Sequence, residues 1–86
     1  MKNYVFTAHC YETKSGGFAT TPCLLGELFD PERMTLVFRL LWADKGIVYY
    51  GLMDPDSAKH QAQYDYEIYC GCVATEIFVN GKWVEI

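Results

Sequence analysis

The first part of the chain has the apolar pattern of a β-hairpin. Positions 4–11 are rich in β-branched and aromatic residues, which favour strands. The polar segment 13–17 follows, and its two adjacent glycines supply the backbone freedom that a turn requires. Residues 18–21 then fit a returning strand. We therefore expect an N-terminal hairpin.

The next segment, residues 31–44, fits a helix. The preceding Asp30 can cap a first turn, and Pro31 lacks only an N–H that the first helical position leaves unused. Within the segment the polar residues Glu32, Thr35 and Arg39 are spaced three and four apart, which gathers them on one stripe and leaves the apolar residues for burial. We favour this segment as the main helix, with a glycine stop at position 46.

The same segment also fits a strand. Its apolar residues alternate from Leu36 to Trp42, and Asp44-Lys45-Gly46 could turn residues 35–42 back onto residues 47–53. This hairpin stays open as an alternative, because short apolar runs fit both the helical and the strand period.

Residues 47–70 combine strand patterns with one polar stretch. Residues 47–53 are expected to form a strand. Residues 54–57, with the sequence Asp-Pro-Asp-Ser, repeat the composition of a helix start and precede a short polar helix at 58–63. Residues 66–70 are rich in aromatic and branched side chains, and we predict a strand there.

The end of the chain has the clearest turn signal. Asn80-Gly81 lies between the apolar segments 75–79 and 82–86, and this pair suits a two-residue turn in which both central residues have positive φ. The predicted order is therefore β-β-α-β-(α)-β-β. Such an order describes an α+β fold, with an antiparallel sheet packed on one main helix.

Composition and charge limit the class of protein. The chain has 86 residues, 51% of them hydrophobic, which suits one globular domain over residues 1–86. The net charge is −4 and the seven basic residues are scattered singly, which argues against direct nucleic-acid binding. No stretch has the ~20 apolar residues of a membrane span, and no secretory signal is visible. We expect a cytoplasmic protein.

Cys70 and Cys72 are the sharpest candidates for chemistry. In a regular strand their Cα atoms would lie about 6.6 Å apart on one face, so a disulfide between them would need a bend, which Gly71 could provide. Together with Cys10 and Cys23 they equal the ligand count of a structural zinc site, although only Cys70 and Cys72 are close in sequence. A small zinc-binding domain is therefore one alternative.

A cysteine-dependent enzyme is another alternative. Cys23 would need to lie at the start of a helical turn, where the pKa of its thiol would be lowered, and the chain offers only His9 and His60 as partner bases. We favour reduced cysteines that are buried as small apolar residues. We accordingly expect no metal, no cofactor and no catalytic activity.

The aromatic content points to protein binding. Aromatic residues make up 16% of the chain, more than we expect a core of this size to enclose, and tyrosine suits interfaces. If residues 64–69 form a strand, Tyr64, Tyr66 and Ile68 share one face and the acidic residues between them share the other. The predicted binding surface consists of Tyr49, Tyr50, Tyr64, Asp65, Tyr66, Glu67 and Tyr69.

We therefore expect a small non-catalytic protein that binds another protein, as a regulatory or inhibitory subunit or as a homodimer. Short acidic domains of this kind are common among inhibitors encoded by phages and mobile elements. A second route to assembly is edge pairing, because residues 83–86 could form an exposed strand that extends a sheet across a two-fold axis.

Overall fold

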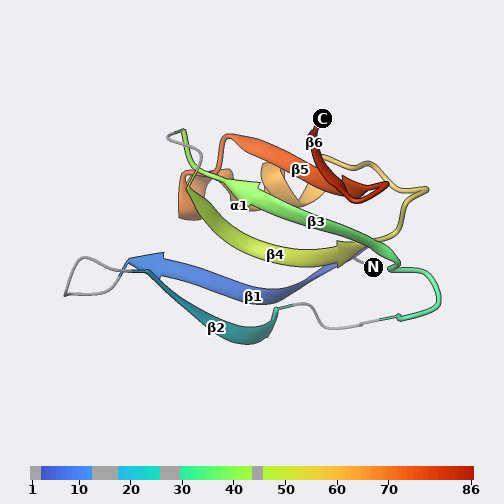
Figure 1. The fold of residues 1–86 in the computed structure, drawn as a ribbon, viewed down its shortest axis with the longest axis horizontal. Helices are drawn as coiled ribbons and strands as arrows, with labels where there is room; N and C mark the ends of the chain where they lie inside the picture. Colours follow the sequence, from blue (N-terminus) through green and yellow to red (C-terminus); the bar gives the residue numbers. More distant parts are fainter. Residues whose placement is uncertain (1–2, 13–17, 26–29, 44–45) are drawn as a thin grey trace.

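The computed structural model describes residues 3–12, 18–25, 30–43 and 46–86, apart from the side chains of residues 11–12, 18, 22–25 and 69–70. Six strands and one helix occur in these residues (Figure 1). They are β1 (Tyr4–Glu12), β2 (Phe18–Leu25), β3 (Leu36–Leu41), β4 (Ile47–Met53), α1 (Gln61–Cys70), β5 (Ala74–Val79) and β6 (Lys82–Glu85). The predicted α+β fold is confirmed.

The six strands form one antiparallel sheet in the order β2-β1-β4-β3-β5-β6. Three pairs of consecutive strands, β1 with β2, β3 with β4 and β5 with β6, are joined side by side through β1–β4 and β3–β5 pairing. β2 lies at one edge, where Pro22 is tolerated because an edge strand can leave one N–H position unused. β6 lies at the other edge.

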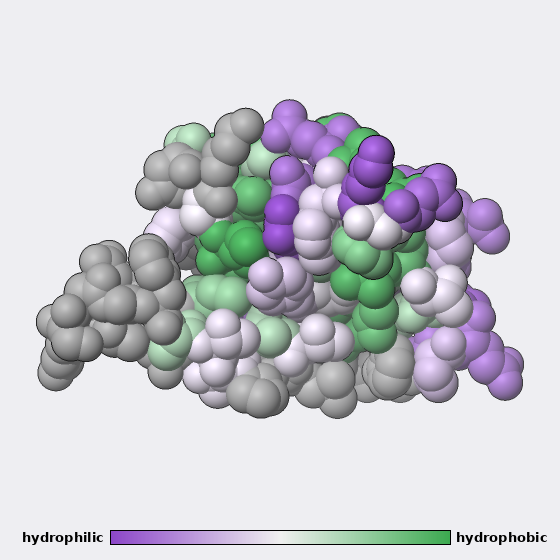
Figure 2. Space-filling view, in the orientation of Figure 1, coloured by the Kyte–Doolittle hydropathy of each residue, from purple (hydrophilic) through white to green (hydrophobic). Residues whose placement is uncertain are grey.

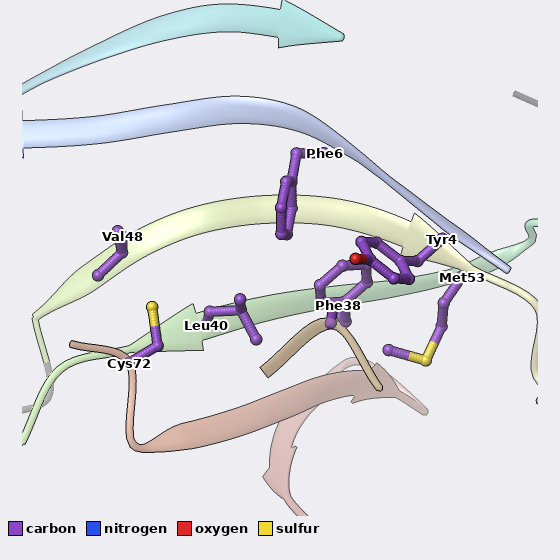
Figure 3. Close-up of a cluster of buried hydrophobic side chains, with 8 residues drawn as sticks. Tyr4, Phe6, Phe38, Leu40, Val48, Met53 and Cys72 are labelled. Carbon is purple, nitrogen blue, oxygen red and sulfur yellow. The ribbon is translucent and has the colours of Figure 1, made fainter. Parts of the chain in front are cut away.

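The core lies between α1 and one face of the sheet. Its buried members are Tyr4, Phe6, Phe38, Leu40, Val48, Met53, Ala62 and Cys72 (Figure 3). Ala62 comes from α1, Cys72 follows it, and the other six come from the three strands β1, β3 and β4. Each large apolar side chain that is fully buried contributes about 1.5 to 3 kcal/mol, so this layer holds α1 against the sheet.

Gly51 allows the aromatic core to lie close to the sheet. It pairs with Phe6 on β1 and with Phe38 on β3. A Cβ atom at this position would collide with the carbonyl oxygen of Val5 and would lie only 2.6 Å from Cε1 of the Phe38 ring. The absence of a side chain at Gly51 therefore makes room for the ring of Phe38.

Two side-chain hydrogen bonds of Arg33 hold the segment before β3 in place. The guanidinium of Arg33 donates from Nη2 to Oδ1 of Asn3 at 2.7 Å and from Nε to Oδ2 of Asp54 at 3.3 Å. These bonds connect the segment to the start of β1 and the end of β4. The adjacent Met34 is thereby held in a buried position.

The helix predicted for residues 31–44 is wrong, and the alternative hairpin is correct. The helix-start residue Asp30 forms a single turn: its backbone oxygen accepts the N–H of Met34 at 2.8 Å, and its Oδ1 accepts the N–H of Glu32 at 3.1 Å. β3 follows and pairs with β4 on one side and β5 on the other. Backbone bonding from two neighbours therefore outweighs the helical spacing. Asp44 and Lys45 lie outside the described residues.

The strand predicted for residues 66–70 is also wrong, because these residues belong to α1. The short helix predicted for 58–63 begins at Gln61 and continues to Cys70. It ends at Gly71, which has φ 68° and donates its N–H to the carbonyl oxygen of Glu67 at 3.0 Å. Asp54 instead starts a turn, in which its Oδ1 accepts the N–H of Asp56 at 2.9 Å.

Both terminal hairpins are confirmed. Asn80 and Gly81 have φ of 53° and 78°, as their turn requires, and Val79 pairs with Lys82 across it. β1 pairs with β2, while the predicted turn residues 13–17 lie outside the described part of the chain. β2 extends to Leu25, so Cys23 lies in a strand and not at the start of the helical turn that the cysteine-enzyme alternative would need.

Candidate functional site

The side of α1 that faces the sheet is identified by two residues that pack against the core. Tyr66 packs against the core, and its ring centroid lies 4.8 Å from that of Phe6 and 6.3 Å from that of Tyr49. Ala62, one turn earlier, is buried. Because residues four apart share one side of a helix, these two residues define the side of α1 that faces the sheet.

Polar residues of α1 are also turned inward. Asp65 accepts a hydrogen bond from the hydroxyl of Tyr4 at 2.6 Å and another from Nε2 of Gln61 at 2.7 Å. Burial raises the pKa of the Tyr4 phenol well above its ordinary value, and the hydrogen bond to Asp65 adds to the increase. Nearby, the buried Thr75 donates from Oγ1 to Oε1 of Gln63 at 2.7 Å. The carboxylate of Asp65 therefore anchors α1 to β1.

The outward side of α1 carries large apolar side chains. Ile68 is 88% exposed and Tyr64, one turn earlier, is 61% exposed. Glu67 is exposed between them, and the imidazole of His60 stacks near the ring of Tyr64 with centroids 6.0 Å apart. We call Tyr64, Glu67 and Ile68 the outer face of α1. This face combines two apolar groups with one carboxylate.

The predicted binding residues do not form one surface. Tyr64 and Glu67 lie on the outer face of α1, whereas Asp65 and Tyr66 are turned toward the sheet. Residues 64–69 alternate differently from the prediction because they form a helix rather than a strand. The side chain of Tyr69 lies outside the described residues.

The two tyrosines of β4 point to opposite faces of the sheet. The ring of Tyr49 lies between those of Phe6 and His9, with centroid distances of 4.3 Å and 4.7 Å and nearly parallel planes. A shift of register in β1 between Phe6 and Ala8 brings Phe6 and His9 onto the same face. Tyr50 lies on the opposite face, 6.0 Å from the ring of Trp83.

The face opposite α1 carries a charged pair beside aromatic rings. Arg39 contacts Glu76, with Nη2 2.6 Å from Oε1, and its guanidinium lies 4.0 Å from the ring centroid of Trp83. The ring of Trp83 also packs against Phe78, which is 42% exposed. Figure 2 shows this face, where apolar residues form two green patches with a purple polar strip between them. The pair is a structural contact between β3 and β5.

Ile68 is the most exposed large apolar side chain among the described residues, and the predicted binding surface did not include it. Its signal lies in the helical spacing of residues 61–70: once Ala62 and Tyr66 are placed inside, Ile68 must lie outside. The other large apolar side chains with substantial exposure among the described residues are Val73, Phe78, Val79, Val84 and Ile86. Four of these belong to β5, β6 and the residue after β6.

The cysteines offer no metal site in the described residues. No group of three or more His, Cys, Asp or Glu side chains that could hold a metal occurs there. Cys72 is 1% exposed and disulfide-bonded, so it differs from the reduced thiol that we predicted and has no thiolate for zinc. Cys10 is a free thiol with its sulfur 3.6 Å from Oγ1 of Thr20. The side chains of Cys23 and Cys70 lie outside the described residues.

The only helix of the described residues, α1, has ten residues and lacks the length and apolar content of a membrane span. No protein-family model, no curated protein and no solved structure matches this chain.

Proposed function

We propose that this protein acts by binding another protein, as a regulatory or inhibitory subunit, and that the outer face of α1 is the contact. The observation that supports this proposal is the arrangement of α1: it turns the carboxylate of Asp65 toward the sheet and leaves Ile68 88% exposed. A helix that serves only to cover a sheet normally places its apolar residues inward and its charged residues outward.

The outer face has the spacing of helix-in-groove recognition. Tyr64 and Ile68 are four residues apart and project from one side, as anchor residues of such helices do. Full burial of an isoleucine side chain contributes about 1.5 to 3 kcal/mol, so two such anchors can carry much of a moderate affinity.

The charge of this surface specifies the partner further. Glu67 lies on the outer face, and the chain has a net charge of −4. We infer a partner with an apolar groove flanked by lysine or arginine, whose positive charge would raise the association rate and fix the orientation. Neither nucleic acid nor a lipid surface fits this combination of an exposed isoleucine and a carboxylate.

The proposal is tested by comparing Ile68→Lys with Val73→Lys. Val73 is 56% exposed and lies outside α1, so the two variants gain the same charge and lose similar apolar surface. Wild-type and variant proteins are immobilised and exposed to lysate of the organism that makes the chain, and each protein retained is purified for titration calorimetry. We expect a partner whose affinity falls at least about tenfold with Ile68→Lys but little with Val73→Lys. Equal affinity of every partner for both variants would contradict the proposal.

The absence of catalytic activity stays a prediction, and so does the cytoplasmic location. The disulfide at Cys72 is more typical of oxidising compartments, and it gives a reason to measure the redox state of the chain in cells.

A further inference from the structure

The edge strand β6 has backbone groups available for pairing. Across the two-residue turn, Val79 pairs with Lys82 and Ile77 with Val84, and the N–H of Ile86 donates to the carbonyl oxygen of Thr75 at 3.1 Å. In an antiparallel pair such bonding alternates along the strand. The N–H and C=O groups of Trp83 and Glu85 therefore point away from β5, and no strand in the described part of the chain pairs with them.

The two edges of the sheet differ in their protection. β2 carries Pro22, and its pairing with β1 has a register shift, both of which hinder the addition of another strand. β6 has neither a proline nor a register shift. It also has apolar side chains beside its open edge, since Val84 is 45% exposed and Ile86 is 37% exposed.

A second copy of the chain fits this edge. A two-fold axis perpendicular to the sheet at Val84 keeps every side chain on its own face and aligns Trp83 with Glu85 of the other copy. The outward backbone groups of these two residues then form four hydrogen bonds across the axis. The exposed side chain of Val84 meets its own symmetry mate, at the distance of about 4.5 Å between Cα atoms that such non-hydrogen-bonded pairs have.

Charged side chains on the face of the sheet opposite α1 also favour the alignment of Trp83 with Glu85 of the other copy. Within one chain Glu85 is directly opposite Glu76, whose carboxylate is bound by Arg39. In the two-fold arrangement the carboxylate of Glu85 lies opposite Trp83 of the other copy, and the guanidinium of Arg39 lies 4.0 Å from that ring. Opposite residues have Cβ atoms about 4.5 to 5.5 Å apart, which brings a carboxylate near this guanidinium.

We propose that β6 pairs with β6 of a second copy across a two-fold axis at Val84, so that the sheets of two chains join into one continuous sheet. The surface is separate from the outer face of α1. The Ile68→Lys variant should therefore dimerise as the wild type does.

The backbone part of the proposal is tested with Glu85→Pro and Glu85→Ala. The N–H of Glu85 has no role in pairing with β5, so proline at this edge position leaves the bonds of the single chain intact but removes two bonds across the axis. Analytical ultracentrifugation should show a wild-type dimer whose Kd rises roughly tenfold or more in Glu85→Pro and by much less in Glu85→Ala. A monomeric wild type, or equal Kd values for wild type and Glu85→Pro, would overturn the proposal.

A cross-linking variant remains informative if the proline variant does not fold. The Cα separation expected at Val84 lies within the range of a disulfide, so Val84→Cys should form a covalent dimer on mild oxidation. Phe78→Cys is the matched control, because this residue is similarly exposed on β5 and lies one strand away from the axis. Equal cross-linking of the two variants would reject the register. A foreign strand bound to monomeric β6 would reject the second copy as its occupant.

Discussion

Replacing Tyr4 with phenylalanine removes a single hydroxyl from a buried position and leaves the ring in place. In the wild type this hydroxyl donates to Oδ2 of Asp65 at 2.6 Å and connects β1 to α1 across 61 residues of sequence. A hydrogen bond to a carboxylate contributes about 1.5 to 3 kcal/mol. Asp65 keeps its bond from Gln61, so we expect Tyr4→Phe to lower the free energy of unfolding by about 2 kcal/mol at neutral pH.

The same variant should change how stability depends on pH. Burial, followed by the hydrogen bond to Asp65, raises the pKa of Tyr4 in the folded chain above its ordinary value of 10.0. The stabilising contribution of Tyr4 is therefore fully present below about pH 10, and it declines at higher pH because the unfolded chain ionises first. From about pH 8 to about pH 11 the wild type should lose about 1.4 kcal/mol more than Tyr4→Phe.

Urea unfolding followed by circular dichroism at several pH values measures both effects. Tyr64→Phe is the control: this side chain is 61% exposed, and its replacement should change the free energy of unfolding by less than about 0.5 kcal/mol. A gap between wild type and Tyr4→Phe that stays constant up to about pH 11 would refute the reasoning about burial. Equal stability at neutral pH would refute the importance of the hydrogen bond.

Two further substitutions test the core. Gly51→Ala should lower the free energy of unfolding by about 3 kcal/mol, because the new methyl group collides with the Val5 carbonyl oxygen and lies 2.6 Å from the Phe38 ring. A thermal midpoint within about 5 °C of the wild-type value would contradict this prediction. Thr75→Val keeps the shape of a fully buried side chain but leaves Oε1 of Gln63 without its donor. We expect this variant to lower the free energy of unfolding, measured in urea, by about 1 kcal/mol. Unchanged stability would show that water replaces the hydroxyl.

Turn chemistry made the C-terminal hairpin predictable from sequence. Asn80 and Gly81 both have positive φ, and few residue pairs adopt such a turn at low energy. The signal is local, so it holds whatever surrounds it. The fold class was predictable as well, because most of the chain has strand character and at least one segment has the pattern of a helix.

The identity of β3 was not predictable from local pattern. Residues 36–41 fit both periods, and the helix-start residues at 30–32 added a signal that produces only one turn. The outcome depends on β4 and β5, which pair with β3 on its two sides, and on Gly51, which makes room for Phe38. None of these neighbours is visible in a short window of sequence.

The choice of residues for the binding surface depended on whether residues 61–70 have the period of a strand or of a helix. The tyrosines in this segment favour strands, and the prediction of a strand placed Tyr64 and Tyr66 on one face. Gly71, which ends α1 with a positive φ, was the available signal for a helix. The inward role of Asp65 could not be predicted, because its donor Tyr4 lies at the other end of the chain.

The arrangement of the strands also has a consequence for the order in which the chain folds. Each of the three hairpins joins strands that are neighbours in sequence, so only a short loop has to close. The β1–β4 and β3–β5 contacts connect residues that are much farther apart, and long-range pairing slows folding. We therefore expect the hairpins to form before they pair side by side, and we expect the long-range contacts, which include the hydrogen bond from Tyr4 to Asp65, to form last.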